Sequence, residues 1–153
     1  MPDAPKFVAD AMLGSLARKL RIFGFDTAYF SEGEDRALQS LAVEESRVIL
    51  TSDEALFAQS KRRGIPAYLI KGTTDRARLA SLWRQAGLPP EARRGLSRCA
   101  VCNGALENVE RDRAFALGVP AKVVARHRLF FRCAACGKLY WRGRHWQRLW
   151  RLR

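Results

Sequence analysis

Four cysteines form two Cys-x-x-Cys pairs, the clearest chemical pattern in this sequence. Cys99 and Cys102 make the first pair, and Cys133 and Cys136 make the second, with thirty residues between the pairs. Each pair can supply two thiolates to one ion from a tight turn. The spacing therefore predicts a zinc ion bound by four thiolates.

This zinc ion should be structural, because four thiolates leave no open coordination position. His127 and His145 could each replace a cysteine as a ligand, but four thiolates already satisfy the ion. Two disulfides are the alternative, which the expected cytoplasmic location disfavours. Gly104 and Gly137 follow the pairs, and we expect a positive φ at both, as such turns often need.

Three aspartates lie where a predicted strand gives way to a predicted helix: Asp10, Asp35 and Asp53. The carboxyl ends of parallel strands face one crevice, so these side chains can converge there. Clustered carboxylates repel one another unless a divalent cation such as Mg²⁺ or Mn²⁺ lies between them. Such a metal can generate a hydroxide nucleophile and stabilise the leaving oxygen of a phosphodiester. The pattern predicts a metal-dependent nuclease.

Helix capping is the alternative role for these aspartates. Asp35 and Asp53 are suitable residues for a helix N-cap or first turn, where each would stabilise the helix by roughly 0.5 to 2 kcal/mol. Taken singly, either of them is explained by capping. Asp10 precedes Ala11-Met12-Leu13 and is harder to assign to capping alone.

The C-terminal stretch 138–153 has six basic residues, no acidic residue and four aromatic residues. Bases stack on aromatic rings and phosphates pair with guanidinium groups, so this composition suits RNA binding. We expect RNA contacts from Arg142, Arg144, His145 and Trp146. The alternative is a terminal helix whose apolar face, Trp146, Leu149 and Trp150, docks on the rest of the protein.

The elements that would position these residues alternate between strands and helices. Strands are predicted over 6–9, 26–30, 47–50 and 67–70, and helices over 12–23, 35–45, 54–63 and 74–86. This alternation predicts a small three-layer α/β domain with a parallel sheet. Residues 88–98 are expected to be a linker, and strands over 129–132 and 138–142 should form a hairpin around the second cysteine pair. We therefore expect a domain over 1–95 and a zinc ribbon over 96–153.

The charge is unevenly distributed along the chain. The 153 residues carry a net charge of +13, of which +3 falls in residues 1–95 and +10 in residues 96–153. Such an excess favours a polyanionic partner and is unusual for an enzyme acting on small neutral substrates. No stretch approaches the roughly 18 apolar residues of a membrane span, so a cytoplasmic protein is expected.

Three segments carry a family resemblance. FVADAMLGSLARKLRIFGFDTAYF, SEGEDRALQSLAVEESRVILTSDEAL and CAACGKLYWRGRHWQRL occur in this order and together cover nearly the whole chain. In these segments the sequence resembles the PIN-like ribonuclease family named after the C-terminal domain of the Mut-seven exonucleases. The resemblance implies a PIN-like domain with an appended zinc ribbon, and RNA, with tRNA and rRNA as candidates, as the substrate.

The resemblance also implies roles for individual residues. Asp10, Asp35 and Asp53 match the acidic positions of the family and would bind the catalytic metal. Arg18 and Arg21 match its basic pair on the first helix and would contact phosphate. Thr51 and Ser52 match its hydroxyl positions, and would either bind the phosphate or cap the helix. The fourth acid of PIN nucleases is left open among three residues, Glu54, Asp75 and Asp26.

Other functions remain open at this point. A PIN-like fold can persist as a non-catalytic RNA-binding module, associated with tRNA or the ribosome. A nuclease acting on DNA or a transcription-linked zinc ribbon is a further alternative, as is a toxin-like ribonuclease paired with a protein antitoxin. The oligomeric state is unknown.

Overall fold

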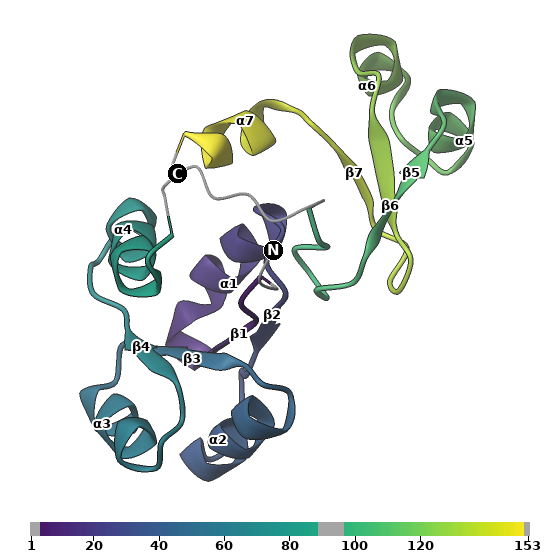
Figure 1. The fold of residues 1–153 in the computed structure, drawn as a ribbon. Coiled ribbons are helices and arrows are strands. Elements are labelled where there is room, and N and C mark those ends of the chain that lie inside the picture. The colour runs from purple at the N-terminus through teal and green to yellow at the C-terminus, as the bar shows by residue number, and fades with distance from the viewer. Residues whose placement is uncertain (1–3, 89–96, 152–153) are drawn as a thin grey trace.

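The computed structural model describes residues 4–88 and 97–151, which form two lobes (Figure 1). The first, here called the α/β lobe (residues 4–88), contains β1 (Phe7–Ala9), the short 3-10 helix η1 (Ala11–Leu13), α1 (Gly14–Ile22), β2 (Thr27–Tyr29), α2 (Asp35–Glu44), β3 (Val48–Thr51), α3 (Glu54–Arg62), β4 (Ala67–Leu69) and α4 (Asp75–Ala86). The second, the ribbon lobe (residues 97–151), contains β5 (Leu106–Val109), α5 (Arg111–Ala116), α6 (Ala121–Arg126), β6 (Phe130–Cys133), β7 (Leu139–Trp141) and α7 (Arg144–Trp150).

A four-stranded parallel sheet with strand order β2-β1-β3-β4 forms the centre of the α/β lobe. In β1, Val8 pairs with Ala28 of β2 on one side and with Ile49 of β3 on the other. Ile49 in turn pairs with Ala67 of β4 in register. Because all four strands run in the same direction, their last residues lie along one edge of the sheet, here called the C-terminal edge.

Both faces of this sheet are buried, which explains why its strands are short apolar runs. Successive strand residues point to opposite faces. Phe7 and Ala9 therefore pack with residues of α1 and α4, whereas Val8 packs with residues of α2 and α3. Figure 1 shows the corresponding layers, with α1 and α4 on one side of the strands and α2 and α3 on the other. The predicted α/β fold with a parallel sheet and flanking helices is confirmed.

The ribbon lobe contains a three-stranded antiparallel sheet with strand order β5-β6-β7. The expected pairing of the strands that flank the second cysteine pair is confirmed, because Phe130 pairs with Trp141 and Arg132 with Leu139. Strand β5 and helices α5 and α6 were not expected from the sequence. The two helices have six residues each, too few for an apolar period to be recognised. Ala114 of α5 and Val119, which lies between the two helices, form a buried cluster with Phe130, and Val123 and Val124 of α6 pack against it.

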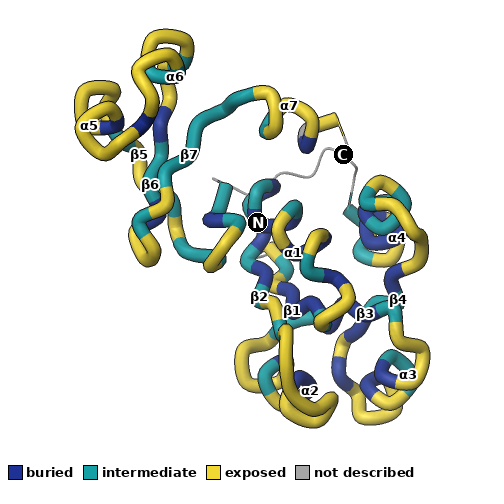
Figure 2. Tube along the Cα trace, turned by 180° about the vertical axis from the view of Figure 1, so that it is seen from behind, coloured by how far each residue is buried: buried dark blue, intermediate teal, exposed yellow. Residues whose placement is uncertain are grey.

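Helix α7 follows β7 and returns from the ribbon lobe towards α4 (Figure 1). Leu149 is buried, and near the C-terminus the Arg76 side chain donates a hydrogen bond of 3.1 Å to the carbonyl of Arg151. The expected terminal helix is therefore present, with Leu149 on its buried side. Figure 2 shows that buried residues concentrate in β1, β3 and α1, while α5 and α6 are largely exposed. The predicted boundary between residues 95 and 96, and most of the predicted linker, fall outside the described residues.

Within the described part of the chain, no helix is both long enough and apolar enough to cross a membrane.

Candidate metal sites and nucleic-acid interface

One threonine hydroxyl connects two of the predicted catalytic aspartates at the C-terminal edge of the sheet. Asp10 follows β1, and Thr51 is the last residue of β3, beside it in the sheet. The Thr51 hydroxyl donates a hydrogen bond to Oδ2 of Asp10 and accepts one of 3.0 Å from the backbone N–H of Asp53. The sheet therefore brings Asp10 and Asp53 together although they are 43 positions apart in the sequence.

Both aspartates also cap helices, so the capping role expected for Asp53 is present. The Asp53 carboxylate accepts hydrogen bonds from the N–H groups of Ala55 (2.8 Å) and Leu56 (3.2 Å) at the start of α3. Only Oδ1 of Asp53 takes part in these bonds. Asp10 accepts a hydrogen bond of 3.1 Å from the N–H of Met12 in η1.

The charge of Asp10 is unfavourable in its surroundings. Burial raises the pKa of this carboxyl, and the negative charges of Asp53 and Asp35 raise it further, while hydrogen bonds from Thr51 and Met12 oppose the rise. The net effect is a raised pKa. A half-buried carboxylate that two neighbouring carboxylates repel would be stabilised by a cation.

Asp35 is the first residue of α2 and is exposed, and the helix has no side-chain cap. Its charge acts on Asp10. Across the described residues, however, the four cysteines are the only group of three or more possible ligands whose donor atoms lie within 4.8 Å of one another. The three aspartates share an edge without closing around one point. This arrangement suits Mg²⁺, which keeps several waters and takes only one or two carboxylates directly.

The three candidates for a fourth acid lie in different surroundings. Asp75, at the start of α4, pairs with Lys19 of α1 at 2.8 Å and accepts a hydrogen bond of 3.2 Å from the Ser15 hydroxyl. The bond from Lys19 holds the pKa of Asp75 below its ordinary value. Glu54 is exposed next to Asp53. Asp26 precedes β2 and so lies at the opposite edge of the sheet, away from the acidic site formed by Asp10, Asp35 and Asp53.

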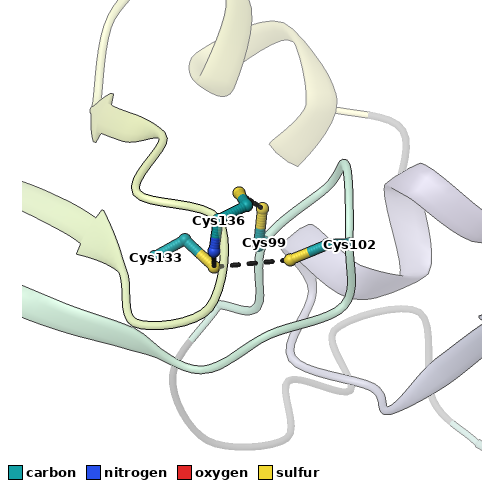
Figure 3. A group of neighbouring side chains, drawn as sticks. All are labelled: Cys99, Cys102, Cys133 and Cys136. Atoms are coloured by element: carbon teal, nitrogen blue, oxygen red, sulfur yellow. Dashed lines mark hydrogen bonds between the residues drawn. The ribbon is translucent and has the colours of Figure 1, made fainter.

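The four cysteines converge in the ribbon lobe as the sequence predicts. Figure 3 shows the four side chains around a common centre, with Cys99 near Cys136 and Cys102 near Cys133. The sulfur atoms of these neighbours are 3.7 Å and 3.4 Å apart, and none of the four cysteines forms a disulfide. The group is a potential metal site compatible with zinc.

The turns after the cysteine pairs differ from the expectation at one position. Gly137 has the expected positive φ of 79°, but in the first turn the residue with positive φ is Asn103, at 67°. Gly104 is needed for another reason, since a Cβ there would lie 2.8 Å from Sγ of Cys133 and 3.2 Å from Sγ of Cys102. The first turn therefore takes its left-handed residue one position earlier, and Gly104 makes room for the sulfur atoms.

A tyrosine supports the first cysteine pair. The hydroxyl of Tyr140 in β7 lies 3.0 Å from Sγ of Cys99 and accepts a hydrogen bond of 3.1 Å from the N–H of Ala100. Burial opposes ionisation of Cys99, but hydrogen bonds from Tyr140 and from backbone N–H groups lower the pKa of this thiol to about 6. Thiolates are the form that binds zinc, and the hydrogen bond from Tyr140 stabilises this form of Cys99. This role of Tyr140 has no signature in the sequence, because the tyrosine and Cys99 are 41 positions apart.

Polar contacts dock the first cysteine pair on the α/β lobe at the edge opposite the aspartates. Arg21 is buried, and its guanidinium donates hydrogen bonds of 2.8 Å to the carbonyls of Thr27 and Ala100. Asn103 accepts a hydrogen bond of 3.1 Å from the N–H of Thr27 and donates one of 2.7 Å to Asp26. These residues form part of the interface between the two lobes.

The basic and aromatic residues of the C-terminal stretch surround a cavity of about 360 Å³ between β6, β7, α7 and the end of α1. Its lining includes all four residues expected to contact RNA: Arg142, Arg144, His145 and Trp146. The Arg142 guanidinium lies over the ring of Trp146, with 4.8 Å between its Cζ and the ring centroid. The same Cζ lies 5.8 Å from the ring centroid of Phe131. The sheet and α7 therefore gather these residues around one space.

A family model described as the Mut7-C RNAse domain matches residues 5–152. The chain belongs to the Mut7-C RNAse domain family. The match covers both lobes. Comparisons with curated proteins and with solved structures give no significant match.

The family resemblance implies RNA contacts for two arginines and two hydroxyl residues, and the structure places these residues in different surroundings. Arg18 is exposed on α1, where phosphate can reach it. Arg21 is instead buried in the lobe interface, which does not fit the phosphate contact expected of it. Thr51 is fully buried between two aspartates, and the Ser52 hydroxyl donates a hydrogen bond of 3.1 Å to the carbonyl of Ile70. Their positions favour support of the acidic site over direct contact with RNA.

Proposed function

We propose that this member of the Mut7-C family is a ribonuclease that hydrolyses RNA phosphodiester bonds with the aid of Mg²⁺ or Mn²⁺. The observation that carries the proposal is the hydrogen-bonded link from Asp10 through Thr51 to Asp53 at the C-terminal edge of the sheet. Membership in an RNase domain family supports the same reading. Together they indicate a nuclease site.

Asp10, Asp35 and Asp53 are the proposed ligands of the catalytic metal, directly or through bound water. Bound there, the metal would activate a water molecule for attack on phosphorus and stabilise the leaving oxygen. Thr51 holds the Asp10 carboxylate in place and lowers its pKa, which favours the charged form that binds a cation. Arg18 supplies a positive charge on the adjacent helix for the RNA backbone.

The ribbon lobe is proposed to bind RNA next to this site. A zinc ion held by Cys99, Cys102, Cys133 and Cys136 would fix the turns that carry it, and much of the positive charge of the protein lies in this lobe. Arg142, Arg144, His145 and Trp146 are its proposed RNA contacts. The proposed location is the cytoplasm.

The test compares cleavage of labelled single-stranded RNA, tRNA and rRNA fragments by the purified full chain with Mg²⁺, with Mn²⁺ and with EDTA. Asp10→Asn and Asp53→Asn are the variants of choice, because asparagine keeps the helix-capping acceptor and removes the charge. Asp112→Asn, at an exposed acid in the first turn of α5, is the matched control. We expect cleavage that requires the metal, persists in the control and is lost in both site variants.

A non-catalytic RNA-binding protein is the second candidate, because capping gives Asp10 and Asp53 a structural role that needs no metal. This candidate predicts tight RNA binding without cleavage of any substrate, and unchanged binding in both site variants. Cleavage of single-stranded DNA at the rate found for RNA would instead favour a general nuclease. Inhibition by a co-purifying protein would favour the toxin-like alternative.

A further inference from the structure

The cavity between the ribbon sheet and α7 has walls suited to a flat aromatic ligand. Phe131 of β6, Tyr140 and Trp141 of β7, and Trp146 of α7 all line it. At about 360 Å³ the cavity lies within the range of small-molecule sites, roughly 300 to 1000 Å³. Gly143, between β7 and α7, keeps this space open beside Trp141, since a Cβ there would lie 3.3 Å from Nε1 of its indole.

The electrostatic character of the same cavity points to an anionic ligand. Four cations contribute to its lining, Arg98, Lys138, Arg142 and Arg144, and none of the described residues that line it is acidic. A purely hydrophobic partner would gain nothing from these cations. An aromatic group attached to a phosphate matches both the rings and the charges.

We propose that this cavity binds a single unstacked nucleotide of the RNA, with the base against the aromatic side chains and its phosphate against the surrounding cations. The Arg142 guanidinium lies over the ring of Trp146, which holds it in place, and its N–H groups can donate to a phosphate. Bases that stack on aromatic rings bind with little dependence on sequence. This inference rests on the proposed action on RNA and names the part of the RNA that the ribbon lobe recognises.

The experiment measures binding and not cleavage, so that it is independent of the nuclease proposal. A fluorescein-labelled eight-nucleotide RNA and an abasic RNA of the same length, which keeps every phosphate and lacks the bases, are titrated with the full chain at one fixed salt concentration without Mg²⁺ or Mn²⁺. We expect tighter binding of the RNA that carries bases. Loss of one base–aromatic stack corresponds to about a 5- to 150-fold change in affinity.

Three variants locate this preference in the cavity. Trp146→Ala should remove most of the preference while affinity for abasic RNA is kept, and Trp146→Phe, which retains a ring, should keep it. Arg113→Ala removes an exposed cation that belongs to the same lobe but does not line the cavity, and it should weaken the binding of both RNAs equally. Zinc content and thermal unfolding of each variant establish that the lobe is folded.

Equal affinity of the wild-type chain for the two RNAs would overturn the proposal, as would Trp146→Ala weakening both to the same extent. A change from dimer to monomer on Trp146→Ala would also overturn it and assign the cavity to a contact between two copies. A full base preference without any ribonuclease activity would leave the cavity assignment standing and remove the proposed function alone.

Discussion

The side-chain amide of Asn103 donates a hydrogen bond of 2.7 Å to the carboxylate of Asp26, which joins the first cysteine turn of the ribbon lobe to the sheet of the α/β lobe. Asp26 is also paired with Arg47 at 2.8 Å, and after the opposing effect of burial these contacts lower its pKa. One asparagine thus connects the turn that shapes the potential metal site with the interface between the lobes.

Asn103→Gly should destabilise the protein by about 1 to 3 kcal/mol, because it removes the acceptor of the Thr27 N–H and one of the two side chains that hydrogen-bond to Asp26. Glycine keeps the left-handed conformation of this position, so backbone strain does not contribute. Urea unfolding followed by tryptophan fluorescence measures the change. Asn108→Gly, at an exposed position of β5, is the control for substitution by glycine in this lobe. An equal loss in both variants would contradict the role of Asn103.

Asp10→Asn should make the folded protein more stable at neutral pH, in buffer without Mg²⁺ or Mn²⁺. The folded-state pKa of Asp10 is raised, so the native state binds more protons than the unfolded state, and stability falls as the pH rises through that pKa. Asparagine carries no charge and escapes this loss. Below the ordinary carboxyl pKa of 3.8, Asp10 is neutral in both the folded and the unfolded state, and the variant should be no more stable than the wild type on this account. Denaturant unfolding at a series of pH values tests this, and a gain independent of pH would contradict it.

Thr51→Val should move the acidic limb of the pH–rate profile for RNA cleavage to higher pH. The Thr51 hydroxyl lowers the pKa of Asp10, so without it the carboxylate forms only at higher pH. Thr51→Ser keeps a hydroxyl and should restore the original limb. Ser52→Ala removes the neighbouring hydroxyl, which contacts Ile70 and not Asp10, and should leave the limb in place. An unshifted profile for Thr51→Val would argue against this role of the threonine.

Gly104→Ala should weaken zinc binding by roughly 10- to 100-fold, the range found for residues that support metal ligands. A Cβ at this position would approach Sγ of Cys133 and Sγ of Cys102 too closely, although all four thiolates remain present. Competition with a chelator of known affinity measures the change. Val101→Ala, at an exposed position within the first cysteine pair, should retain wild-type affinity. Equal affinities of the two variants would show that the turn tolerates a methyl group.

The parallel sheet and the cysteine cluster were predictable because each leaves a repeated local pattern. Strands such as Phe7–Ala9 are buried on both faces and appear as short apolar runs between amphipathic helices. The cysteine pairs carry their ligand spacing in the sequence itself. For Asp10 and Asp53, position after adjacent parallel strands was enough to predict that they lie at the same edge.

The lobe interface was not predictable in the same way. Arg21 shows an ordinary helical position in the sequence, and its burial depends on carbonyl groups of Thr27 and Ala100, the second of them 79 positions away. Asn103 and Tyr140 likewise act through partners that only the tertiary fold brings close. Helices α5 and α6 are too short to leave a periodic signal, and they are stabilised by packing on Phe130 and not by helix propensity.

The ribbon lobe docks at the edge of the sheet opposite the aspartates, and α1 runs between this interface and the aspartates. The last residue of α1, Ile22, lines the cavity. The residue just before α1, Leu13, belongs to the 3-10 helix that Asp10 caps. A helix of nine residues is about 13 Å long, and the rigid packing of α1 on the sheet fixes this separation. An enzyme that binds one nucleotide at one end of α1 and cleaves the RNA at the other end would act as a molecular ruler. Cleavage would then occur at a constant number of nucleotides from the bound base, and RNAs too short to span the length of α1 would not be cleaved.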